Sequence, residues 1–282
     1  DQTVAPGESR TYTYYAHPLN KETTSLVWDG GNIVVNPRNG LYGAIVIGPK
    51  GSQYRDPVTG ADVSQKNVWR ADVIVDTTLT ENAGKRNYRD VALFFQDEDN
   101  IIGTAFMPYV QNVAGLTSVN YRAEPYKFRE EQGCSLGKIF QPCAVDKPED
   151  PVTPLIEAHA GDAVRIHVIG ANSEQNGMFG VEGHEWPIEP YMPGADMISV
   201  VEYAGSEVLD VFIRGGAGGP YRQVGDFVWS NARLPYTQSG QWGYLRVLPT
   251  GDSRIQPLSA SGSGARQAEV QPGAQAIPTA MK

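Results

Sequence analysis

The chain has 282 residues, of which 40% are hydrophobic and 20% charged, a balance typical of globular rather than disordered proteins. This length allows one large domain or two of ordinary size. The net charge of −9 argues against a nucleic-acid partner, and no apolar run reaches the length of a membrane span. The chain begins at Asp1 without an initiator Met, so we expect a processed protein or a piece of a longer polypeptide.

The first 50 residues predict a small and incomplete β unit. Thr and Tyr alternate after a Pro-Gly turn, which predicts a strand with one buried face over residues 4–16. The nearly continuous apolar run 41–47 predicts a central strand. Because a sandwich typically needs about seven strands, we expect residues 1–50 to form a partial domain that another segment or chain completes. Residues 51–66 are rich in turn residues and predict a linker.

Residues 67–250 predict a complete all-β sandwich. Short runs of branched and aromatic residues alternate with turn signals, and no sustained period of 3.6 residues indicates long helices. Residues 97–150 predict a long inserted loop, and residues 251–282, which contain no aromatic residue, predict a flexible or strap-like tail. The predicted strands are 68–76, 89–95, 155–158, 163–170, 198–203, 208–213, 226–230 and 242–248.

The two cysteines, Cys134 and Cys143, bracket a short loop-like stretch. Their spacing suits a disulfide, which would place the protein in an oxidising compartment. Two unpaired thiols are the alternative, and a metal pair is disfavoured because no His lies near either Cys in the sequence.

Residues 226–247 read DFVWSNARLPYTQSGQWGYLRV. This stretch resembles the last copper motif of multicopper oxidases: an aromatic residue, His-Cys-His, a His four residues on, then Gly-Met and an apolar strand. In that frame the His-Cys-His positions hold Ser230, Asn231 and Ala232. Tyr236 stands at the next His and Gln241 at the Met. A blue copper centre uses a thiolate and two imidazoles, so this frame lacks what copper needs.

Other stretches extend the resemblance over roughly residues 5–250. They are 40–50 (GLYGAIVIGPK), 91–99 (VALFFQDED), 120–129 and 150–170. In particular they resemble the large bacterial multicopper oxidases that include manganese oxidisers. The resemblance implies cupredoxin-like Greek-key β-sandwiches, one partial and one complete, in an extracellular or periplasmic protein.

The same resemblance locates the remaining ligand positions. Trp28 aligns with the Trp of the second motif, so that Gly30 and Asn32 stand where its two His residues belong. Residues 177–186 (GMFGVEGHEW) align with the third motif, and Gly177, Gly180 and Glu182 replace its ligands. Only His184 is kept, at a position that is not a copper ligand in the family. We therefore expect no cofactor in this chain, with copper, where the assembly has any, held elsewhere.

Other metal sites have weaker support. The run Asp97-Glu98-Asp99 could hold calcium or manganese through its oxygens, against the alternative of solvated charges. Glu182, His184 and Glu185 form a second candidate group. His159 and His167 could meet across a turn, although a structural role is expected for each.

These observations leave three alternative functions for the chain. The first is a copper-free cupredoxin segment that serves as a structural or interface part of a larger multicopper-oxidase-like assembly, not catalytic alone. Its partner would be another cupredoxin segment or subunit that completes residues 1–50. The second is a fragment of a split or nicked copper-dependent oxidoreductase, oxidising a metal ion or small reductant with oxygen, whose ligands lie in other segments. The third is an assembly or coat protein that reuses the fold. We expect Trp28, Trp186 and Trp242 to be core residues.

Overall fold

The computed structural model describes residues 4–17, 20, 22–33, 35–99, 115–141, 150–173 and 175–258. The described chain is built of strands with two short helices, α1 (Tyr126–Glu131) and α2 (Leu234–Gln238). No helix in these ranges is long and apolar enough to span a membrane. The strands are β1 (Thr23–Trp28), β2 (Tyr42–Ile47), β3 (Gln53–Arg55), β4 (Arg70–Ile74), β5 (Tyr88–Asp99), β6 (Gly115–Val119), β7 (Ile156–His159), β8 (Val164–Ser173), β9 (Gly177–Val181), β10 (Trp186–Pro187), β11 (Met197–Ile198), β12 (Val200–Tyr203), β13 (Val208–Phe212), β14 (Gly225–Asn231) and β15 (Trp242–Leu248).

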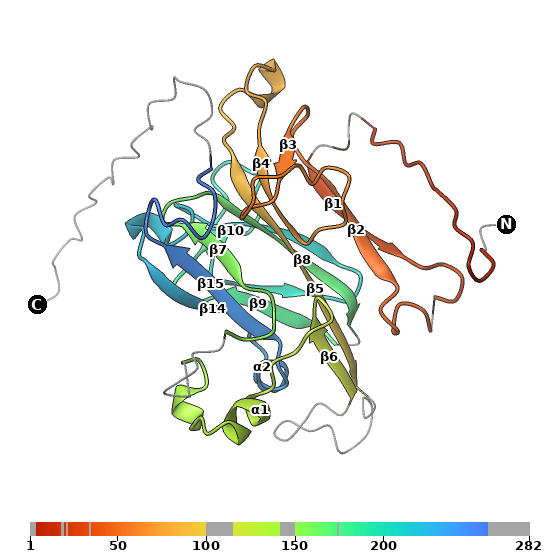
Figure 1. The fold of residues 1–282 in the computed structure, drawn as a ribbon, viewed down its shortest axis with the longest axis vertical. Helices are drawn as coiled ribbons and strands as arrows, with labels where there is room; N and C mark the ends of the chain where they lie inside the picture. The colour runs from red at the N-terminus through yellow and green to blue at the C-terminus, as the bar shows by residue number, and fades with distance from the viewer. Residues whose placement is uncertain are drawn as a thin grey trace, which may run out of the picture.

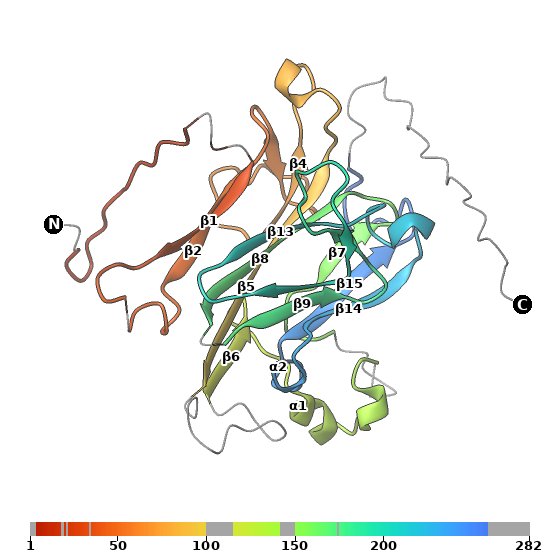
Figure 2. The same cartoon turned by 180° about the vertical axis from the view of Figure 1, so that it is seen from behind.

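Two sheets pack face to face to form the body of the protein (Figures 1 and 2). One has the strand order β12-β9-β14-β15-β7, and the other β13-β8-β5-β4-β3, with β6 paired to β5. The core between them takes alternate residues from both sheets, including Phe95 on β5 and Trp229 on β14, neither of which is exposed. Burial of such large apolar side chains is the main force that holds the layers together.

Strand pairing within this sandwich is mixed. β5 runs parallel to β8, and β7 runs parallel to β15, whereas the other neighbours are antiparallel. Parallel neighbours need a crossover between the sheets, which produces a Greek-key-like sandwich rather than a simple meander. The predicted all-β, Greek-key sandwich is thereby confirmed.

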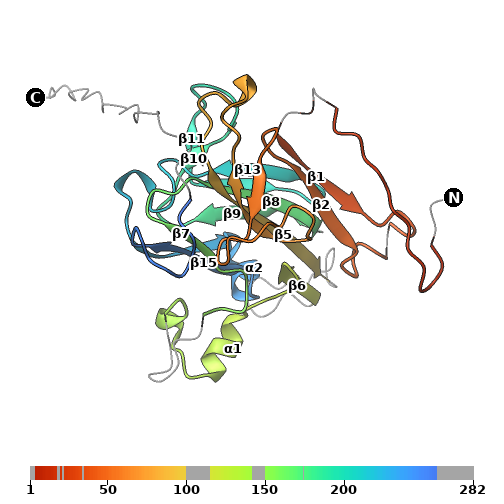
Figure 3. The same ribbon diagram turned by 45° about the horizontal axis from the view of Figure 1, so that its top comes forward.

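A third, smaller layer is the hairpin of β1 and β2, which form a two-stranded sheet of their own. It packs on the outer face of the six-stranded sheet, as Figure 3 shows from a tilted view. Leu26 and Ala44 contact the buried residues Ala92 and Ile169 there. The prediction of a central strand over residues 41–47 is wrong: among the described residues β2 pairs only with β1, and it is half-buried. Its apolar run covers a neighbouring sheet instead of filling a core.

Two further expectations for the N-terminal part are wrong. Residues 4–16 form no strand and are exposed, and Figure 1 shows them outside the sheets. Alternation of side chains forms a strand only where a neighbouring strand lies beside it. Trp28 is 43% exposed rather than a core residue, although its Nε1 donates to Ala171 O at 3.0 Å. Trp186 and Trp242 are buried as predicted, at 1% and 0% exposure.

Residues predicted as connections contain regular structure. The predicted linker 51–66 holds β3, the outer strand of the six-stranded sheet. Within 97–150, β5 continues to Asp99, β6 pairs with it, and α1 follows. Cys134 is buried beside Trp242, but Cys143 lies outside the described residues, so the disulfide stays a prediction.

The first residues of the predicted tail are pinned to the body. Ile255 is 1% exposed, and Gln256 N donates to Pro57 O at 2.7 Å. Arg89, on β5, donates to Gln256 O at 2.8 Å. Residues 259–282 lie outside the described ranges. Residues 251–258 therefore act as a strap across one end of the sandwich.

Candidate functional site

Most of the predicted copper-ligand positions lie on or next to the neighbouring strands β9, β14 and β15, where they divide between the two faces of one sheet. Side chains alternate along β14, so Asn231 points inward and is 1% exposed, whereas Ser230 is half-buried and Ala232 is exposed. Ser230 pairs with Gly180 on β9. Glu182, one residue beyond β9, is also exposed. Gly30 and Asn32 lie in the exposed turn of the β1–β2 hairpin, which is a different sheet.

The inward positions meet in a cluster of buried hydrogen bonds that we call the amide cluster (Tyr203, Asn231 and Gln241). Asn231 Nδ2 donates to Gln241 Oε1 at 2.7 Å and to Tyr203 Oη at 3.2 Å. Asn231 Oδ1 accepts from the backbone N of Met178 at 3.0 Å. Gln241 Nε2 donates to Gln96 O at 2.9 Å. The two side chains predicted at the Cys and Met positions therefore bond to each other.

Gly177 and Tyr236 complete this group. Gly177 lies opposite Tyr203 in the β9–β12 pairing, and a Cβ at 177 would overlap the Tyr203 ring. The ring thus fills the space that a larger residue at 177 would need. Tyr236, on α2, is 2% exposed, and its carbonyl accepts from Gln241 N at 3.0 Å. Four of the predicted positions, Gly177, Asn231, Tyr236 and Gln241, are brought together around Tyr203.

The chemistry of the amide cluster does not suit copper. Carboxamide nitrogens and a neutral phenol are not the soft thiolate and imidazole donors that a blue copper centre uses. Burial raises the pKa of Tyr203 well above its ordinary value, so its hydroxyl stays protonated. Each polar atom of the two amides has a partner, and the cluster is a closed structural network.

Asp97 and His184, which we considered as ligands of another metal, have other partners. Asp97 is 1% exposed and accepts from Ser173 Oγ, whereas the side chains of Glu98 and Asp99 lie outside the description. His184 Nε2 accepts from Gly218 N at 3.0 Å, so its proton is on Nδ1, which donates to Glu182 O at 2.8 Å. Burial lowers the pKa of His184 and favours this neutral form. Among the described residues, no group of three or more His, Cys, Asp and Glu side chains could hold a metal ion.

A second polar cluster, which no sequence motif predicts, lies under the β1–β2 hairpin. His167, on β8, bonds Asp90 Oδ1 through Nε2 at 2.8 Å and Asp210 Oδ1 through Nδ1 at 2.5 Å. Arg165 donates to Asp210 Oδ2 at 2.9 Å, and Thr24 of β1 bonds His167 Nδ1 at 2.7 Å. His159 lies on β7 in the other sheet, so the two histidines do not meet as we had considered. The signal available in the sequence was Arg165 and His167, two charged or titratable residues at alternate positions of an otherwise apolar strand.

This cluster should make stability depend on pH. Burial lowers the pKa of His167, but Asp90 and Asp210 outweigh burial and raise it above 6.5. Its contribution to stability is therefore full below about pH 6.5 and is lost as pH rises through the folded pKa. Burial raises the pKa of Asp210, yet His167 and Arg165 lower it to about 2, so its contribution is lost as pH falls from 3.8 toward that value.

We expect urea denaturation across pH to show the greatest contribution of the cluster between about pH 4 and 6.5. His167→Gln should flatten the decline above that range. His17→Gln, at an exposed position, is the matched control and should follow the wild-type curve. An unchanged alkaline limb in His167→Gln would contradict the assigned charge state.

No family model and no curated protein matches the sequence. Solved structures similar to this chain include a multicopper oxidase (15% identity, TM-score 0.47, 87% of this chain and 62% of that chain). They also include a blue copper oxidase from Nitrosomonas europaea (16% identity, TM-score 0.49, 88% of this chain and 61% of that chain). A third is a copper nitrite reductase from the same organism (12% identity, TM-score 0.49, 89% of this chain and 70% of that chain).

The chain spans less than two thirds of the length of the first two of these structures. Identities this low concern the fold alone, and they carry no activity or copper site over to this chain. The fold of this protein is an all-β sandwich of two sheets.

Proposed function

We propose that this chain is a copper-free cupredoxin segment that forms a structural, interface part of a larger multicopper-oxidase-like assembly. The observation that carries the proposal is the amide cluster, because the buried amides of Asn231 and Gln241 stand where the sequence places lost copper ligands and are bonded to each other and to Tyr203. A site closed by mutually satisfied hydrogen bonds has no open coordination position for a metal.

The β1–β2 hairpin supports the interface role. It is a two-stranded sheet whose strands pair only with each other among the described residues, and Ile33, Val35 and Leu41 in its turn are 68%, 47% and 51% exposed. Isolated two-stranded sheets need packing from neighbours to be stable. The partner we propose is another cupredoxin segment or subunit that extends this layer. The finer parts of the proposal are an extracellular or periplasmic location and an assembly of the type that includes manganese oxidisers.

Copper binding by the purified chain tests the proposal. We expect no stoichiometric copper after incubation with Cu(I) or Cu(II) and desalting, as measured by elemental analysis. We also expect no intense absorption near about 600 nm, the band of Cys-ligated copper. Copper bound by the isolated chain, and lost in Asn231→Leu or Gln241→Leu, would contradict the proposal.

The same measurement on intact, unseparated source material distinguishes the alternatives. Copper there but not in the isolated chain, with enzymatic oxygen consumption, would identify a fragment of a split oxidase whose ligands lie in other segments. Copper in neither sample, with the chain eluting as a large homogeneous assembly on a sizing column, would identify a coat or assembly protein.

A further inference from the structure

A cleft of about 710 Å³ opens between the β1–β2 hairpin and the outer face of the six-stranded sheet. Small-molecule sites typically have volumes of about 300–1,000 Å³ and combine apolar walls with a few polar groups. The cleft is lined by residues of β2, β4 and β5, by Tyr54 of β3 and His167 of β8, by the loop that precedes β4, and by Asn120 and Tyr121 after β6. It is separate from the amide cluster, none of whose side chains lines it.

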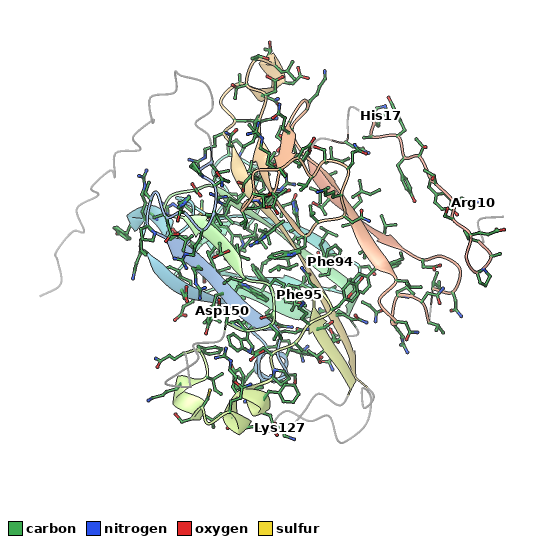
Figure 4. All side chains as sticks on the ribbon, in the orientation of Figure 1. Arg10, His17, Phe94, Phe95, Lys127 and Asp150 are labelled. Carbon is green, nitrogen blue, oxygen red and sulfur yellow. The ribbon has the colours of Figure 1, made fainter. Side chains whose placement is uncertain are left out.

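Aromatic rings form much of the lining. Tyr42 stacks on Phe94 and on Tyr121, with ring centroids 5.8 Å and 5.2 Å apart. Figure 4 labels Phe94 beside Phe95 on β5; Phe94 packs beneath the hairpin, whereas Phe95 belongs to the sandwich core. Trp69 lines the cleft from the loop before β4. The faces of such rings carry a negative quadrupole that attracts cations.

A single carboxylate lies among these rings. Asp90 is 8% exposed and is the only acidic residue of the cleft lining in the part of the chain that the structure describes. His167 holds its Oδ1 at 2.8 Å, and no described residue hydrogen-bonds its Oδ2. His167 is in turn held by Asp210, so the Asp90 carboxylate is fixed in place before any ligand arrives.

Of the three basic residues of the lining, His167 pairs with Asp90 Oδ1, whereas Arg70 and Lys66 do not compete for this carboxylate. Arg70 lies 5.1 Å over the Trp69 ring, and its Nη1 is 3.6 Å from Glu157 Oε2, on the far side of the Trp69 wall. Lys66 is exposed in the loop before β4. Because His167 pairs with Oδ1, the charge of Asp90 is partly compensated, and Oδ2 is the oxygen that the described residues leave for a ligand, in a chain whose net charge is −9.

We propose that this cleft binds a small organic cation, an alkyl- or arylammonium compound. Its carbon skeleton lies against Tyr42, Phe94 and Trp69, and its ammonium group donates to Asp90. The pairing combines a charge-assisted hydrogen bond with a cation on aromatic faces, both of which strengthen out of water. The site is independent of whether the assembly holds copper.

Matched probes of one size test the proposal: 2-phenylethylammonium, the neutral 2-phenylethanol and the anion phenylacetate. We expect calorimetry and amide NMR shifts to show the cation binding at least tenfold more tightly than the alcohol, with no binding of the anion. Asp90→Asn should weaken binding of the cation at least tenfold, and Trp69→Leu should weaken both the cation and the alcohol. Glu189→Gln, an exposed carboxylate outside the cleft, is the charge-matched control and should bind like the wild type.

Equal binding of cation and alcohol, binding unaffected by Asp90→Asn, or no shift of the cleft amides at millimolar cation would overturn the proposal. Circular dichroism must show that each variant is folded. If Asp90→Asn does not fold, the three probes on the wild type and the Trp69→Leu variant decide the question.

Discussion

Replacing Arg89 with alanine should lower the free energy of unfolding by about 3–5 kcal/mol, because it leaves buried carboxylates without their counter-ion. Arg89 is 2% exposed; its Nη1 donates to both oxygens of Asp72 at 2.7 and 2.9 Å, and its Nε to Asp162 at 2.8 Å. Its Nη2 holds the C-terminal strap at Gln256 O. One side chain thus joins β4, β5, the turn before β8 and the strap.

The loss should also depend on pH. Burial raises the pKa of Asp72 to about 6 even with Arg89 beside it, and removing the cation should raise it further. A carboxyl whose folded pKa lies above its unfolded value of 3.8 loses stability as pH rises through this range. Urea denaturation of Arg89→Ala should therefore show a smaller deficit near about pH 4 than near pH 7.

Arg254→Ala is the matched control for Arg89. Arg254 has a side chain 51% exposed and pairs with Asp252 on the surface. Its loss should change the free energy of unfolding by about 1 kcal/mol or less. An Arg89→Ala variant that is as stable as Arg254→Ala would refute the role of Arg89 in joining these segments.

Trp242→Ala should also cost about 3–5 kcal/mol in the free energy of unfolding, the range for removing a buried large aromatic side chain. Trp242 is not exposed, and its ring packs against Phe140 and Tyr244 with centroids 4.9 and 5.7 Å away. Its Nε1 donates to Glu124 O at 2.7 Å, and Arg129 of α1 lies 5.0 Å over the ring. The substitution should therefore loosen the α1 region from β15 as well as open a cavity.

Guanidinium denaturation with tryptophan fluorescence measures this effect. Trp28→Ala is the control: Trp28 is 43% exposed and makes one hydrogen bond, so it should cost about 1–2 kcal/mol. Hydrogen exchange should show faster opening of residues 126–133 in Trp242→Ala alone. Equal losses in the two variants would show that the ring does not anchor this region.

Much of the fold could be predicted because strands carry a local signal. Residues 208–213 and 242–248 have the branched and aromatic composition of β13 and β15, which the structure places almost at those bounds. β9 was missed because Gly177 and Gly180 interrupt its pattern. A glycine is needed at position 177 because the Tyr203 ring occupies the space of a Cβ there. Tyr203 is distant in the sequence and lies opposite Gly177 in the sheet.

The candidate sites show the same division. The positions that the family resemblance assigns to lost copper ligands could be named from the sequence, but their sorting into the inward amide cluster and the outward face required the pairing of β14 with β9. The Asp90–His167–Asp210 cluster combines three strands, β5, β8 and β13, whose neighbours are set by a parallel pairing and a crossover. No local sequence pattern predicts that these three side chains lie in contact.

The sequence by itself determined the all-β class and the absence of Cys and His from residues 226–247, since composition and alternation are local properties. Only the tertiary structure decided that residues 4–16 and Trp28 are exposed, that 42–47 belongs to a separate hairpin, and that Arg89 and His167 are centres of buried ion networks. The physical reason is that burial and charge pairing depend on which distant segments lie alongside, and a side chain of given chemistry is a core residue, a surface residue or a counter-ion according to those neighbours.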